Sequence, residues 1–168
     1  VGSDCLMTVL NWLANVDARY QKGIMIGFDG RHTRGHIYRS ILEAVAMTMK
    51  RHVTDMCNEV GTTINKLIIT GGGSNSDLFM QIFADVFDIP VVRNEVNGAA
   101  GLGSAICAAV AAKVYDSFES AVEHMVRIKD RFTPIAENVE VYEKLLPVYS
   151  EITGCTDPIL KKSYEIFD

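Results

Sequence analysis

Apolar and polar residues follow two different periods along the chain, and these predict strands and helices in turn. Residues 22–28 alternate and contain two isoleucines, which is typical of a strand. In residues 33–61 the apolar side chains, from Ile37 to Val60, recur at steps of three and four, which predicts a long amphipathic helix that ends at the glycine. Residues 65–70 form a second β-rich run, which leads directly into three consecutive glycines.

The rest of the pattern predicts one more strand and several helices. A helix begins near Ser76 and Asp77, which are favoured N-cap residues. A strand follows at residues 89–92, with Pro90 at its start. Residues 97–112 form a helix of very small side chains, which predicts tight packing against a neighbouring element. Three further helices are predicted at residues 5–14, 117–129 and 139–152. This alternation indicates an α/β domain with a helical C-terminal tail.

The composition of the chain indicates a globular domain and argues against some classes of binding partner. Its 168 residues suffice for one domain with an ordinary core, and 48% apolar with 22% charged residues is globular composition. A net charge of −5 argues against a nucleic acid or an anionic membrane as partner. No apolar run is long enough to cross a membrane. The four cysteines have neither a C-x-x-C pair nor ligand spacing with histidine, which predicts a reducing, cytoplasmic location and no structural zinc.

The clearest chemistry lies in residues 67–92, where a strand ends in Gly71, Gly72 and Gly73 and a helix begins a few residues later. Glycine reaches positive φ at little cost and lets a ligand approach the backbone. The helix N-terminus adds unpaired N–H groups that suit a phosphate or a polar ring edge. On the glycines alone, a ligand-binding loop and a simple tight turn are equal alternatives. The spacing matches neither the G-x-G-x-x-G dinucleotide fingerprint nor the phosphate-binding P-loop.

Residues 71–92, GGGSNSDLFMQIFADVFDIPVV, resemble the adenosine-binding motif of the FGGY carbohydrate kinases. That family belongs to the superfamily of actin, hexokinase and the heat-shock ATPases. Glu95 and the small-residue helix after it resemble the family's E…GAA…GAA segment. Residues 23–47 resemble its glycine-bounded strand followed by HTR and LE, and residues 142–149 resemble its closing Y..LYPxY helix. The similarity, to xylulokinase-like and glycerol kinase-like members, therefore covers nearly the whole chain.

This resemblance implies an α/β fold of the actin-like ATPase, or ribonuclease H-like, type, present in part and followed by the helical tail. Residues 1–168 would be the C-terminal nucleotide-binding domain, without the N-terminal sugar-binding domain. The glycines would line the ribose and α-phosphate, and the polar residues after them would meet the adenine edge. A second contact, near the phosphates, would come from the predicted helix that carries Trp12. The nucleotide-binding residues implied in this way are Gly71, Gly72, Gly73, Ser74, Asn75, Ser76 and Asn11.

The resemblance also implies an activity, the phosphorylation of a sugar or polyol hydroxyl, of pentulose type, by ATP with Mg²⁺. Such a transfer needs a base, a metal ion and phosphate positioning. In FGGY kinases the catalytic aspartate lies earlier in the sequence than the part that this chain resembles. The hairpin that holds the β- and γ-phosphates also lies earlier. We therefore assign no catalytic residue and no metal ligand, leave Mg²⁺ mainly to the absent part, and expect the chain alone to be inactive.

The expected partners are ATP or ADP and, through the absent domain, the sugar, with a homodimer left open as an assembly. An alternative from another class is a non-catalytic nucleotide-sensing or oligomerisation module that keeps the actin-like fold. A third is an unrelated α/β domain whose glycine turn binds nothing.

Other polar residues have simpler interpretations. His32 and His36 are four apart, but HTRGH lacks the glutamate of H-E-x-x-H, so capping or structural roles are favoured over metal binding. Asp29 is expected to make a turn, and Glu43 to serve packing or hydrogen bonding within the long helix. Because the resembling proteins separate the tryptophan helix from the following strand by several dozen residues, we also expect additional residues within 13–19 in the natural protein.

Overall fold

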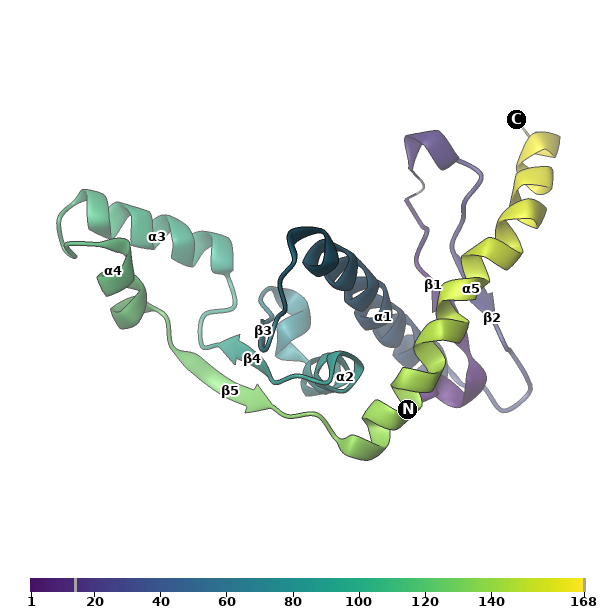
Figure 1. The fold of residues 1–168 in the computed structure, drawn as a ribbon, viewed down its shortest axis with the longest axis horizontal. Helices are drawn as coiled ribbons and strands as arrows, with labels where there is room; N and C mark the ends of the chain where they lie inside the picture. The colour runs from purple at the N-terminus through teal and green to yellow at the C-terminus, as the bar shows by residue number, and fades with distance from the viewer. Residues whose placement is uncertain (14, 168) are drawn as a thin grey trace. The chain divides into compact units, whose positions relative to one another are not determined.

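The structure is a computed structural model that describes residues 1–13 and 15–167 (Figure 1). Contacts divide the chain into two compact units. The first comprises Val1–Thr62 and Ile135–Asp168, and the second comprises Thr63–Pro134. The mixture of helices and strands, with a long helix at the C-terminal end, agrees with the predicted α/β class.

The first unit begins with a two-stranded hairpin. β1 (Met7–Val9) pairs antiparallel with β2 (Ile24–Ile26), so that Met7 lies opposite Ile26 and Val9 opposite Ile24. A short 3₁₀ turn, η1 (Gly2–Cys5), precedes β1, and another, η2 (Val16–Ala18), lies between the strands.

The helix predicted at residues 5–14 is therefore wrong, although β2 is confirmed. Its apolar stripe is not a buried face, because Leu6 is buried while Leu13 is 97% exposed. β1 instead pairs with β2 and lies against α1, where the β-branched side chains of Thr8 and Val9 are buried, and this outweighs a weak helical pattern. At the far end of the hairpin the Trp12 ring lies over Gly23, where a Cβ atom would come 1.9 Å from the ring.

The long helix α1 (Arg34–Val60) is confirmed, and it ends at Gly61 in the left-handed conformation, with φ +69°. Its buried face is not the predicted apolar stripe, since Met49, Met56 and Val60 are exposed. The residues that are buried instead are mostly small or polar, namely Ser40, Glu43, Ala44, Ala46 and Met47. Small side chains allow β1 and η1 to lie close to the helix, and the buried glutamate serves as a hydrogen-bond centre.

The C-terminal helix α5 (Ala136–Phe167) is longer than the predicted tail and continues through Pro147 and Pro158. It buries Tyr142, Tyr149 and Ile152 in the first unit. None of the helices described, α1 and α5 included, is apolar enough over a sufficient length to cross a membrane.

The second unit contains a three-stranded sheet in the order β3-β4-β5. β3 (Leu67–Ile68) pairs parallel with β4 (Val91–Asn94), and β5 (Ile128–Phe132) pairs antiparallel with β4. The predicted helix α2 (Asp77–Phe87) connects the two parallel strands. Its apolar face packs against the sheet, at β4 and β5. Its buried side chains include Met80, Ile82, Phe83, Val86 and Phe87.

Two expectations for the second unit need correction. The helix predicted at residues 117–129 stops early, as α4 (Phe118–Met125), because the following residues pair with β4 as β5. Helix α3 (Ala99–Ala111) forms as predicted, but its small face is not tightly packed within this chain. Cβ atoms added at Gly101 or Gly103 would meet no heavy atom within 4 Å.

Candidate functional site

The glycine loop lies where β3 ends, as the sequence predicted. Gly71 has φ +83° and donates its N–H to the carbonyl of Asn97 at 2.8 Å. Residues Gly72–Asn75 then form a 3₁₀ turn, η3, which leads into α2. Only Gly71 of the three glycines has positive φ, so it alone needs glycine for its backbone conformation.

The other two glycines differ in what surrounds them. A Cβ atom at Gly73 would lie 2.8 Å from the Phe79 ring, so packing against α2 limits side chains there. A Cβ atom at Gly71 or Gly72 would meet nothing within 4 Å. Neither its backbone conformation nor its packing therefore requires glycine at Gly72, and the backbone of this residue borders open space.

The three polar residues after the glycines are held in different ways. Ser74 is buried, and its hydroxyl donates to the carbonyl of Gly71 at 2.7 Å, which closes the turn. The Ser76 hydroxyl accepts the N–H of Phe79 at 3.3 Å and so caps α2. Asn75 is exposed, and its side-chain oxygen accepts an N–H from Asn97 at 2.9 Å. Asn75 is thus the polar side chain of this loop that faces solvent.

Arg93, on β4, connects the loop to the rest of the second unit, and the sequence reasoning missed it. Its side chain is only 8% exposed and donates to the carbonyl of Ser74 at 2.8 Å. It also contacts Asp77, in the first turn of α2, at 2.7 Å, and holds both oxygens of Asp130 at 2.7 Å. The hydrogen bonds to Asp130 and, after them, Asp77 raise the pKa of Arg93, and Arg93 lowers the pKa of Asp130.

A signal for Arg93 was present in the sequence. An arginine that directly follows two buried valines of a strand must find partners, because a buried charge without them is strongly disfavoured. The partner Asp130 lies on β5, however, and no strand was predicted there, because the predicted helix extended to residue 129. Without β5, the ion pair could not be inferred.

Gln81 and Asp85 in α2 have structural roles. The amide of Gln81 donates to a carboxylate oxygen of Asp85 at 2.7 Å and to the carbonyl of Thr133 at 2.9 Å. These bonds join α2 to the segment after β5.

Asn11 lies in the first unit, in a turn after β1 and not in a helix. The helix from which its nucleotide role was inferred is absent, and the role stays a prediction. The expectation of additional residues within 13–19 involves Ala14, which lies outside the described residues. That expectation stays a prediction.

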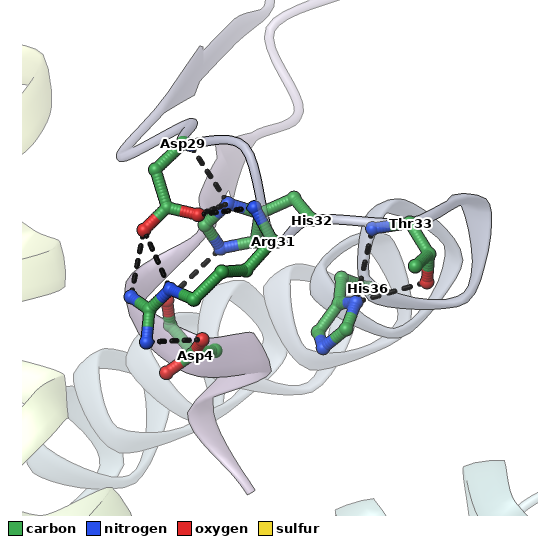
Figure 2. A network of polar contacts seen from close by, with 6 residues as sticks. All are labelled: Asp4, Asp29, Arg31, His32, Thr33 and His36. Carbon is green, nitrogen blue, oxygen red and sulfur yellow. Dashed lines mark hydrogen bonds and ion pairs between the residues drawn. The ribbon is translucent and has the colours of Figure 1, made fainter.

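The two histidines form hydrogen bonds in the turn before α1 and at the N-terminus of this helix (Figure 2). His32 accepts the N–H of Asp29 on Nδ1 at 2.8 Å, and its Nε2 contacts the carbonyl of Asp4 at 3.0 Å, which fits a donor there. His36 accepts the N–H of Thr33 on Nδ1 at 3.1 Å and completes a capping box. The expected structural roles are confirmed.

Asp29 makes the turn before α1, as expected. Its carboxylate accepts the backbone N–H of Arg31 at 2.8 Å and two guanidinium bonds at 3.0 and 2.6 Å, which Figure 2 shows beside the ion pair of Arg31 with Asp4. The Arg31 side chain is the main reason that the pKa of Asp29 falls to about 2. Among the described residues, no group of three or more His, Cys, Asp or Glu is arranged to hold a metal ion.

Glu43 has the hydrogen-bonding role that was expected of it. Its side chain is 2% exposed and accepts the hydroxyls of Ser3 at 2.7 Å and Tyr142 at 2.8 Å. It also accepts the N–H of Gly2 and the guanidinium of Arg39, both at 2.9 Å. Burial, and then the charge of Glu43, raises the pKa of Tyr142. These bonds hold η1, a turn in which all four residues have positive φ.

The architecture is that of an α/β domain with a glycine loop at the end of a parallel strand. The model of the FGGY family of carbohydrate kinases, C-terminal domain, matches residues 10–112, and the chain belongs to this family. The predicted family and the actin-like fold class are thereby confirmed.

Individual relatives agree with this assignment. The chain is 52% identical, over 98% of its length, to the uncharacterized sugar kinase YgcE of Escherichia coli K12, of which it covers 34%. It is 34% identical over 90% of its length to the ribulokinase of Bacillus licheniformis, of which it covers 29%. The crystal structure of xylulose kinase from Rhodospirillum rubrum superposes with a TM-score of 0.81 at 28% identity, over 96% of this chain and 32% of that one. The chain thus spans about a third of the length of these relatives.

Proposed function

We propose that this chain is the nucleotide-binding part of an ATP-dependent, Mg²⁺-requiring carbohydrate kinase and that its glycine loop binds the adenosine end of ATP. The observation that carries the proposal is the open backbone at Gly71 and Gly72, where no heavy atom lies within 4 Å of an added Cβ. This opening occurs at the end of a parallel strand, where ligands of open α/β sheets bind.

The loop suits the ribose, the α-phosphate and the adenine edge better than a triphosphate tail. The glycine backbone and the N-terminus of α2 supply N–H groups, and Asn75 supplies an exposed amide. Arg93, the cation that contacts the loop, is already held by two carboxylates. In this proposal Ser74 and Ser76 shape the loop through the bonds described above, and Asn11 remains a separate candidate in the other unit.

The hydroxyl substrate is, in our proposal, a pentulose-type sugar, because relatives of this chain carry the names xylulose kinase and ribulokinase. The sugar, the catalytic base and most Mg²⁺ contacts would belong to a part of the protein outside this chain. We further propose a cytoplasmic enzyme with ATP and ADP as its ligands and no nucleic-acid partner. Whether it assembles as a homodimer is an open part of this proposal.

The test is a titration of the chain with AMP, ADP and ATP, followed by NMR of the protein. We expect a Kd on the order of a millimolar, about −4 kcal/mol, for all three nucleotides. Shifts should cluster at residues 71–76. If ATP binds far more tightly than AMP, the contacts to the phosphate tail are present after all.

Gly72→Val sharpens this test. Gly72 does not have positive φ, so a side chain here occupies the open space without straining the backbone. The variant should fold and lose AMP binding. Gly30→Val is the matched control, because Gly30 is likewise open and lacks positive φ but lies in the turn before α1. Equal AMP binding by the two variants would refute the adenosine assignment.

A further inference from the structure

A cavity of about 190 Å³ lies in the first unit, and none of its lining residues belongs to the glycine loop. Its polar lining comes from several segments: α1, α5, the turn after β1 and the residues before β2. These side chains are Asn11, Gln21, Thr48, Arg51, Tyr149 and Thr153. None of the lining residues is acidic, so the cavity is lined by one cation, two amides and three hydroxyls.

Arg51 is the charged group of this cavity. Within residues 1–13 and 15–167 its guanidinium forms no hydrogen bond and no ion pair. The other arginines discussed above, Arg31, Arg39 and Arg93, each hold at least one carboxylate. Arg51 does lie close enough to Tyr149 to favour the ionised phenol electrostatically. A guanidinium beside a polar cavity, without a carboxylate, is suited to an anion that arrives from solution.

The hydroxyl pair supports the same conclusion. Tyr149 is 7% exposed, and its hydroxyl lies 3.1 Å from that of Thr48. One of the two donates to the other, so one hydroxyl hydrogen remains to donate elsewhere. Burial raises the pKa of Tyr149, which keeps the phenol protonated and able to donate. The pair therefore offers a nearly buried donor beside Arg51.

The size of the cavity limits its occupant. A volume of about 190 Å³ is room for roughly six water molecules at about 30 Å³ each. Pockets for drug-sized ligands begin at about 300 Å³. Asp157 does not line the cavity, but its carboxylate accepts an N–H of the lining residue Gln21 at 2.7 Å.

From these observations we infer that the cavity binds a small oxyanion, a phosphate or a compact carboxylate, with Arg51 as its charge partner. The phosphate group could be free or could belong to a larger molecule such as a nucleotide. The lining residues of this cavity all belong to the first unit, whereas the adenosine loop belongs to the second.

The experiment is a titration of the chain with inorganic phosphate, malonate and AMP at constant ionic strength, set with sodium chloride. The expected result is saturable phosphate binding, with a Kd of a few millimolar and NMR shifts at Thr48, Arg51 and Thr153. Arg51→Gln should weaken phosphate binding at least about tenfold, which corresponds to one charge-assisted contact of about 1.4 kcal/mol. Thr153→Val should weaken it about threefold.

Arg34→Gln is the matched control, because Arg34 is, like Arg51, an exposed arginine of the same helix but does not line the cavity. If Arg51→Gln and Arg34→Gln bind phosphate equally, or if phosphate shifts no lining residue, the cavity holds solvent only and the inference is wrong. Gly72→Val should retain phosphate binding, which separates this result from the adenosine proposal. AMP shifts at the lining residues would identify a nucleotide phosphate as the source, and shifts with phosphate alone would identify a free anion.

Discussion

In each unit of this protein a buried charged residue holds an irregular segment in place, and the two residues differ in how far their partners are exposed to water. Glu43 holds the turn η1, and its partners Ser3 and Tyr142 are themselves buried. Arg93 holds the glycine loop, and its partners Asp77 and Asp130 are 75% and 36% exposed. The first network is closed apart from Arg39, whose side chain is 30% exposed, whereas both carboxylates of the second reach the surface.

The exposure of the partners decides how each network responds when one member is removed. A closed network around a buried carboxylate loses much when one member is removed, because the remaining polar groups cannot turn to water. A network that reaches solvent loses less stability, because water replaces the missing partner. The geometry of the Arg93 network then matters mainly for the conformation of the glycine loop. Glu43 should therefore govern stability, and Arg93 should govern ligand binding at the loop.

The largest expected effect is that of Glu43→Gln. The amide keeps the shape of the side chain but cannot accept from four donors and balance Arg39. We expect the free energy of unfolding of the first unit to fall by about 3 kcal/mol, as for a broken buried ion pair. Urea denaturation, with amide exchange in α1, measures this loss. Glu59→Gln, on the exposed side of the same helix, should change it by less than about 0.5 kcal/mol.

Arg93→Lys is expected to have its main effect on the loop. A lysine cannot reach Ser74, Asp77 and Asp130 together, because it lacks the planar fork of the guanidinium. Amide exchange of residues 72–77 should become faster, and AMP should bind roughly fivefold more weakly. Arg131→Lys, an exposed neighbour on β5, is the control. Unchanged loop exchange in Arg93→Lys would mean that the arginine does not hold the loop.

Ser76→Ala removes the side-chain cap of α2. The free energy of unfolding should fall by about 1 kcal/mol, as for other N-cap serines. Since Ser76 Oγ accepts from Phe79, AMP affinity should change less than stability. Ser117→Ala, which removes the equivalent cap of α4, is the comparison variant. A loss of AMP binding without a loss of stability would show that Ser76 contacts the nucleotide instead.

The smallest effect concerns pH. Because Arg93 lowers the pKa of Asp130 below 3.8, the Arg93–Asp130 contact stabilises the fold above that pH. This contribution is lost as the pH falls through the lowered pKa. The unfolding free energy should therefore decline less steeply between pH 5 and pH 2 in Asp130→Asn than in the parent. Parallel acid limbs of the two profiles would contradict the ion pair.

Local patterns in the sequence were sufficient for features that depend on neighbouring residues. Helix α1 ends at Gly61 because glycine takes the left-handed cap at little cost, and α2 begins at Ser76 because its hydroxyl caps the helix. The glycine loop at the end of β3 and the family resemblance were likewise visible. The structural roles of His32 and His36 followed from the absence of a metal-binding motif, and that of Glu43 from its position within the long helix.

Other features were decided only by the tertiary structure. Residues 7–9 and 128–132 became strands because partners distant in sequence, β2 and β4, paired with them, and no local pattern carries that information. The buried face of α1 follows Glu43 and its small neighbours, because η1 and β1 lie close to that face. Arg93 and Arg51 show the same dependence. Whether a cation is paired or free is set by which distant carboxylates the fold brings to it, and only three-dimensional contacts determine that.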